Sequence, residues 1–244
     1  MHFHPFSGLK FSLFALFFII WSGCAEKEIG ISGVPASLSF TSLAGGGAAA
    51  VAAAQQTIQQ GNARVVIDEA SFVIRRVKLK ALDAHEEDFK TGSFVVKLNL
   101  DGTKNTVALA NLPAGTYDRI KFDFHKLDAS EIAAIDLNAA PEFAEFIQDN
   151  GLSIIIKGTF DDNVTDGIAP QNFVFKSRLN EAQEYFFSPG LEIKEGAVSV
   201  NMDLSIDMSQ WFVVNGQIVS PLDARFSSDI EKNIKQSGRK RNSS

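Results

Sequence analysis

The stretch from Val198 to Met208 reads VSVNMDLSIDM and alternates apolar with polar side chains without a break. Successive side chains of a β-strand point to opposite faces, so a period of two predicts a strand with one buried and one solvated face. The side chains expected to face the core are Val198, Val200, Met202, Leu204, Ile206 and Met208.

Several other segments have an alternating or short apolar pattern and predict further strands. They are 63–82, 94–100, 106–110, 117–127, 153–160 and 172–179. In 117–127, Ile120, Phe122 and Phe124 are expected to face inward, and Arg119, Lys121, Asp123 and His125 outward. In 63–82 the inward parity changes between Ile74 and Val77, which predicts a β-bulge at Arg75 and Arg76.

Many short strands separated by loops rich in Gly, Asn and Asp are typical of an all-β fold, here an antiparallel β-sandwich. One segment departs from this texture. Residues 128–151 have a helical pattern interrupted by Pro141, which predicts an inserted connection with one or two short helices.

The first residues of the chain are typical of an export signal. Lys10 precedes the apolar run Phe11–Trp21, which is too short to span a bilayer, and Ser22-Gly23-Cys24 follows it. Small residues before a cysteine resemble the lipobox of bacterial lipoproteins, which implies cleavage after residue 23 and lipidation of Cys24. Because Cys24 is the single cysteine of the chain, an internal disulfide is excluded, and the lipid accounts for the thiol. An ordinary signal peptide with an incidental cysteine is the alternative.

These features divide the chain into four parts. We expect residues 1–23 to be the signal peptide, 24–62 a tether, 63–230 the β-sandwich domain, and 231–244 a basic disordered tail. The tether includes the uncharged, alanine-rich segment 44–61, which is a flexible spacer or a helix. It also includes ASLSFTSL at 36–43, for which an additional strand of the domain is the alternative to a spacer. The expected location is the outer membrane, on its periplasmic face or at the cell surface.

A turn motif carries a resemblance to a known family. Leu112-Pro113-Ala114-Gly115-Thr116-Tyr117 precedes a strand, after VIRRVKL at 73–79 and before the alternating strand at 198–208. Over Ala63–Trp211 this order resembles bacterial lipoproteins of domain of unknown function 4382. The resemblance implies a β-sandwich on a lipid anchor and offers no catalytic residues to carry over. We expect the sandwich to be transthyretin- or immunoglobulin-like. The Tyr117 hydroxyl is expected to bond back to the turn of Pro113 and Gly115.

Enzyme signatures are missing from the sequence, so we expect a non-catalytic binding or assembly domain, with an unrecognised hydrolase as an alternative. His85 has no second histidine at zinc-ligand spacing, and no nucleophile elbow or phosphate loop occurs. The net charge of −6 argues against nucleic acid as a partner.

The remaining partners are the membrane, through the lipid, and a protein or polysaccharide. A sugar-binding module would need exposed Trp or Tyr, but Trp211 is expected in a closing strand. A fimbrial or adhesin subunit is another alternative, with Arg64 as a processing site between tether and domain.

Two acidic loops predict a calcium site. Strand counting places loops 83–93, 111–116 and 161–171 at one end of the sandwich. The carboxylates of Asp161, Asp162 and Asp166 are then near those of Asp83, Glu86, Glu87 and Asp88, and such oxygens are the ligands calcium prefers. The simpler interpretation is that both loops are only solvated and that no cofactor is bound.

Overall fold

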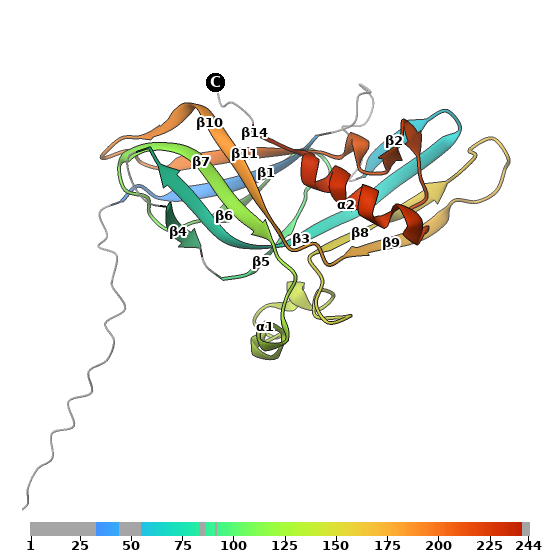
Figure 1. Cartoon of the computed structure of the whole chain (residues 1–244), viewed down its shortest axis with the longest axis horizontal. Helices are drawn as coiled ribbons and strands as arrows, with labels where there is room; N and C mark the ends of the chain where they lie inside the picture. Colours follow the sequence, from blue (N-terminus) through green and yellow to red (C-terminus); the bar gives the residue numbers. More distant parts are fainter. Residues whose placement is uncertain (1–32, 44–54, 83–85, 91, 241–244) are drawn as a thin grey trace, which may run out of the picture. The chain divides into compact units, whose positions relative to one another are not determined.

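The computed structural model describes residues 33–43, 55–82, 86–90 and 92–240, which form two main β-sheets (Figure 1). The eight-stranded sheet contains β2 (Gln56–Gln60), β3 (Ala63–Ala81), β4 (Glu86–Lys90), β5 (Phe94–Lys97), β7 (Gly115–Phe124), β8 (Ile154–Asp161), β9 (Gln171–Ser177) and β10 (Glu181–Ile193). The four-stranded sheet contains β1 (Ala36–Leu43), β6 (Lys104–Ala108), β11 (Val200–Asp207) and β14 (Gly238–Lys240).

Strand β3 organises the large sheet because five other strands pair with it. On one edge it pairs first with β8 and then with β7; on the other it pairs in turn with β2, β5 and β4. All these pairs are antiparallel. The central path is therefore β10-β7-β3-β8-β9, with the three short strands along the other edge of β3.

Two bulges interrupt β3. The predicted bulge at Arg75 and Arg76 is confirmed: Arg75 pairs with Asp123 but Lys78 pairs with Lys121, and Arg76 has a φ of 55°. A second bulge, which the sequence analysis missed, lies at Asp68 between the partners of Ile67 and Glu69. Each bulge changes which parity faces the core.

A glycine in β8 permits a close approach beside the Asp68 bulge. A Cβ atom at Gly158 would lie 1.9 Å from the carbonyl oxygen of Val66, a distance that real Cβ atoms do not reach. Glycine is therefore required here for β8 to pair with β3.

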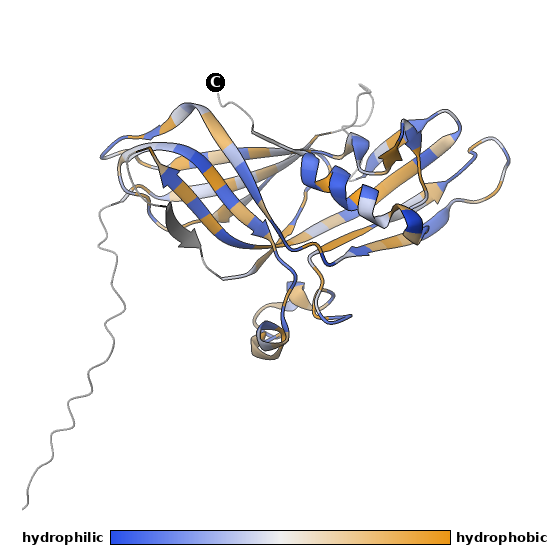
Figure 2. Cartoon of the chain, in the orientation of Figure 1, coloured by the Kyte–Doolittle hydropathy of each residue, from blue (hydrophilic) through white to orange (hydrophobic). Residues whose placement is uncertain are grey.

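The two sheets pack face to face over the β7 and β10 half of the large sheet. Leu38, Phe40, Met202, Leu204 and Ile206 of the small sheet are buried, and Phe40 contacts Phe122 edge to face at 6.0 Å between ring centroids. The predicted all-β sandwich is thus confirmed. Figure 2 shows the alternation of hydrophobic and hydrophilic residues along its strands.

The small sheet corrects the predicted start of the domain. The segment 36–43, placed in the tether, is β1, which lies between β11 and β6 and pairs in parallel with β11. Residues 56–60 of the tether form β2. Burial of Leu38 and Phe40 in the common core explains why β1 belongs to the domain. The rest of the tether, 24–32 and 44–54, lies outside the described residues.

The C-terminal region covers the β8 and β9 half of the large sheet. It contains η2 (Met208–Gln210), β12 (Val213–Val214), β13 (Gln217–Ile218), η3 (Ala224–Phe226) and α2 (Ser227–Gln236). Trp211 is fully buried against Phe72, and Phe212 packs against Phe173 and Phe175, so the prediction of Trp211 in a closing strand is wrong. The two residues follow a short 3₁₀ turn and close the core.

Helix α2 corrects the predicted disordered tail from residue 231. Its apolar side chains Ile230 and Ile234 are buried, and Asn233 donates a hydrogen bond to the Val213 carbonyl oxygen at 2.8 Å. Residues 231–240 are therefore structured because one face of the helix completes the core. No helix among the described residues has the length and apolar character needed to cross a bilayer.

The inserted connection between β7 and β8 matches its prediction. It contains α1 (Ala129–Ala134) and η1 (Pro141–Phe143). Phe143, Phe146 and Leu152 pack with Val73 and Ile155 in a second, smaller core on the outer face of the large sheet. The middle of β3 is consequently buried on both faces.

The β11 assignment yields a stability test with a matched control. Leu204 is 1% exposed in the core, whereas Val198, which was expected to face inward, lies before β11 and is 91% exposed. Leu204→Ala should lower the free energy of unfolding by about 2–5 kcal/mol in urea denaturation. Val198→Ala should change it by less than about 0.5 kcal/mol. Similar losses in the two variants would show that the inward face is wrongly assigned.

Candidate functional site

The candidate site is a pocket of about 490 Å³ at the place where β7 and β8 separate along β3. Val73 marks this place, because its N–H donates to Ser153 O at 2.8 Å and its carbonyl accepts from His125 N–H at 2.9 Å. The insertion fills the gap between the two strands. The polar residues of the pocket wall are Arg75, His125, Lys126, Asp128, Asn150 and Asn180.

The β3 bulge assigns the two neighbouring arginines to different partners. Arg76 donates to the buried Asp123 carboxylate through Nε at 2.6 Å and forms an ion pair with it. Arg75 instead lines the pocket, with Nη1 3.6 Å from Glu131 Oε1. Because Asp123 is 7% exposed, Arg76 provides the charge that this buried carboxylate requires.

His125 is buried, so the prediction that it is a solvated outward side chain is wrong. The ring is 3% exposed; Nε2 lies 2.5 Å from Glu131 Oε2, and Nδ1 lies 3.4 Å from Asn180 Oδ1. The period-two pattern fails here because β7 ends at Phe124 and the insertion folds over the next residue.

Glu131 connects most of the polar groups around the pocket. It accepts hydrogen bonds from Asp128 N–H at 2.9 Å and Ser93 Oγ at 3.0 Å, and it contacts His125 and Arg75. Partial burial acts to raise the pKa of Glu131, but these hydrogen bonds outweigh it and hold the pKa below its usual 4.5. Glu131 is thus a fixed carboxylate at neutral pH.

A capping box holds Glu131 in place. Asp128 caps α1 by accepting from the N–H groups of Ser130 and Glu131, both at 2.9 Å, while Glu131 accepts from the Asp128 N–H. The hydroxyl of Ser130, with these N–H groups, lowers the pKa of Asp128. This reciprocal pair stabilises the start of a short helix whose own residues are not buried.

The geometry suits binding and positioning of a polar group. Both ring nitrogens of His125 have partners, and the Ser93 hydroxyl donates to Glu131 and not to the ring. Acyl transfer needs a nucleophile in contact with its base, and these groups do not form that contact in the part of the chain described.

The predicted meeting of the acidic loops is wrong. Asp161 lies opposite Arg64 near the start of β3, whereas Asp88 pairs opposite Lys78 near its end. At about 3.3 Å per residue the two places are roughly 40 Å apart along the strand. Glu86, Glu87 and Asp88 form β4 instead of a loop, and Asp83 lies outside the described residues.

Two of the three carboxylates of the second loop are used within the fold. Asp161 forms an ion pair with Arg64 at 3.2 Å and accepts from Asn163 N–H, and Asp166 accepts from Ile168 N–H at 2.7 Å; Asp162 is exposed. Within the described ranges, no group of three or more His, Cys, Asp or Glu side chains is placed to hold a metal ion.

The turn before β7 has the predicted structural role. The Tyr117 hydroxyl donates to the Pro113 carbonyl oxygen at 3.0 Å, and Gly115 is the first residue of β7. Tyr117 is buried in the main core, so this bond fixes the turn to the sandwich. Cys24, the predicted lipidation site, and His85 lie outside the described residues.

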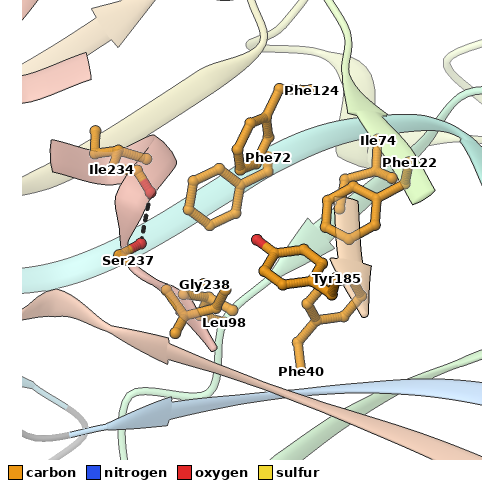
Figure 3. Close-up of a pocket in the computed structure, with 11 residues that line it drawn as sticks. Phe40, Phe72, Ile74, Leu98, Phe122, Phe124, Tyr185, Ile234, Ser237 and Gly238 are labelled. Carbon is orange, nitrogen blue, oxygen red and sulfur yellow. Dashed lines mark hydrogen bonds between the residues drawn. The ribbon is translucent and has the colours of Figure 1, made fainter. Parts of the chain in front are cut away.

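A second cavity lies between the sheets but is too small for an organic ligand. Its volume is about 10 Å³, the space of one water molecule, and aromatic residues such as Phe72, Phe122 and Tyr185 line it (Figure 3). Burial raises the pKa of Tyr185 to about 12. The hydroxyl lies where a Cβ atom of Gly238 would be, so glycine lets β14 close the cavity.

Comparisons with known proteins leave the family open. No protein-family model matches the chain, and no curated protein matches it. Among solved structures, MbnP from Methylosinus trichosporium is similar, with a TM-score of 0.44 and 10% identity over 75% of this chain and 78% of that chain.

The low pKa of Glu131 predicts pH-dependent stability. A carboxylate with a lowered pKa in the folded state contributes stability above its ordinary pKa, and this contribution is lost as the pH falls through the folded value. Glu131→Gln should therefore lower the free energy of unfolding by about 1 kcal/mol at pH 7, and the difference from wild type should shrink below pH 4.5. Urea denaturation across pH measures both.

The control for this test is Glu142→Gln, which changes an exposed glutamate near the insertion's 3₁₀ turn. It should leave the stability nearly unchanged at every pH. A Glu131→Gln effect of constant size from pH 7 to pH 3 would contradict the role given to the carboxylate.

Proposed function

We propose that this protein is a lipid-anchored extracytoplasmic binding protein whose β-sandwich holds a small polar ligand in the pocket beside His125. The signal sequence and Cys24 support the anchor, and the outer membrane is the location that we propose. The resemblance to lipoproteins of domain of unknown function 4382 is consistent with the same arrangement.

The observation that carries the binding proposal is the polar pocket itself. Its volume of about 490 Å³ falls in the range of small-molecule sites, and its walls come from β3, the end of β7, α1 and the loops at Asn150 and Asn180. The contact between the buried His125 and the partly buried Glu131 fixes the wall before any ligand arrives. A preformed site avoids the entropic cost of ordering side chains on binding.

The alternatives have less support. Among the described residues that line the pocket there is no Phe, Tyr or Trp on which a sugar ring would stack. For a fimbrial subunit, processing at Arg64 would remove β1, whose Leu38 and Phe40 are part of the main core. Binding without covalent chemistry therefore fits the site best.

The anchor is tested by Cys24→Ser. The wild-type chain should fractionate with membranes as a mature form labelled by radioactive palmitate, because acyl chains on the cysteine bury many methylene groups in the bilayer. The variant should lose the label and either appear in the soluble fraction or keep its signal peptide. A variant that remains mature, labelled and membrane-bound would exclude Cys24 as the anchor.

Binding is tested by nuclear magnetic resonance on the mature chain in detergent. A set of small neutral polyols, amines and oxyanions is added in turn, and amide shifts are followed. At least one class should shift the backbone resonances of Lys126, Asn150 and Asn180 in a saturable manner while those of β9 stay fixed. Absence of any saturable shift at the pocket with all three classes would contradict the proposed function.

A further inference from the structure

We propose that the pocket binds the oxyanion group of its ligand, a carboxylate or a phosphate, through Arg75 and Lys126. This inference rests on the proposed binding function and names the chemistry of the ligand. It follows from an excess of unused hydrogen-bond donors in the pocket wall.

Arg75 is the first of these donors. A guanidinium has five N–H groups, yet its one ion-pair contact is with Glu131 at 3.6 Å, which is too long for a hydrogen bond. Its Nε is buried without a partner, while 26% of the side chain is exposed at the pocket. The Arg75 side chain makes no hydrogen bond with the described residues, so its Nη groups are available to a ligand that enters the pocket.

The other side chains of the wall add donors. Lys126 is half-buried, and Asn150 and Asn180 are exposed at the rim. None of the three donates a side-chain hydrogen bond to a described residue. Asn150 and its neighbour Asp149 have φ values of 60° and 53°, which turn the backbone sharply at the rim.

Three of the carboxylate oxygens at the pocket already have hydrogen-bond partners. Both Glu131 oxygens have partners: Oε1 accepts from Ser93, and Oε2 contacts His125 and accepts from Asp128 N–H. Asp128 Oδ1 accepts from the N–H and hydroxyl of Ser130 and from the N–H of Glu131. Asp128 Oδ2 and the Asn150 side-chain oxygen make no hydrogen bond with the described residues. The N–H groups of Arg75, Lys126, Asn150 and Asn180 outnumber these two oxygens, so an oxyanion would find more partners than a cation.

The bulge explains why the charge of Arg75 is available. Asp123 is engaged by the partly exposed Arg76, and Glu131, the carboxylate with which Arg75 forms an ion pair, is shared among four donors. Arginine is suited to the task, because its planar N–H pairs match the oxygens of carboxylate and phosphate.

The experiment is a calorimetric titration of the mature chain in detergent at constant ionic strength with three probes. Succinate offers carboxylates, inorganic phosphate offers the other source of the group, and succinamide is a neutral molecule of succinate's shape. We expect saturable binding of succinate or phosphate, and the one that binds more tightly identifies the source. Succinamide should bind at least tenfold more weakly than the preferred oxyanion.

Variants assign the binding to the pocket. Arg75→Gln should weaken the binding of the preferred oxyanion about tenfold or more, and Lys126→Ala should weaken this binding by a smaller factor. Lys232→Ala, an exposed cation on α2, should leave it unchanged. Circular dichroism checks that each variant is folded. If Arg75→Gln does not fold, the comparison of Lys126→Ala with wild type decides the test.

Three outcomes would overturn the inference. If succinamide bound as tightly as succinate, the pocket would be a general polar site, and recognition of an oxyanion group would be excluded. Oxyanion binding that survives in both pocket variants, or falls equally in Lys232→Ala, would show general surface charge. If none of the three probes binds, the oxyanion inference fails, and the proposed function fails with it only if polyols and amines also leave the pocket resonances unchanged.

Discussion

The fold and its pocket both depend on the way β3 pairs along its 19 residues. No other strand pairs with so many partners, and its centre is buried on both faces by the main core and by the insertion. The bulge at Arg76 costs about 1–2 kcal/mol for a left-handed conformation in a residue that has a Cβ atom. The bulge keeps Ile74 and Val77 in the same core and places Arg75 and Arg76 beside different carboxylates. The pocket lies beside this irregularity because β7 and β8 separate there.

Much of the fold could be predicted from the sequence, because burial on one face imposes a period of two. This pattern correctly identified β7, β8, β9 and β11, the Arg75–Arg76 bulge, and the helical insertion. It failed where another rule decided the structure. Because β1 is rich in serine and threonine, the pattern predicted it only as an alternative strand, and α2 is amphipathic but rich in charge. Val198 continued the alternation of β11 beyond the point where the strand begins.

The candidate site was harder to predict, since it joins residues from distant parts of the chain. His125 and Glu131 are six positions apart and are brought together by the capping box of α1, a signal that Asp128 and Glu131 carry in the sequence. Arg75, Asn150 and Asn180 join them only through the tertiary structure. The acidic loops show the converse error: strand counting assumed equal strands in simple succession, whereas β3 is long enough to hold its partners at separate ends.

The central claim is that the pocket floor is part of the rigid core around β3, so the site is formed before a ligand arrives. Native-state hydrogen exchange tests this most directly at two amides: Val73, which donates to Ser153, and His125, which donates to Val73. Both should exchange only through global unfolding, with a free energy equal to that from urea denaturation. If the His125 amide exchanged through a local opening of much lower free energy, the pocket would be a mobile surface feature and the account would be contradicted.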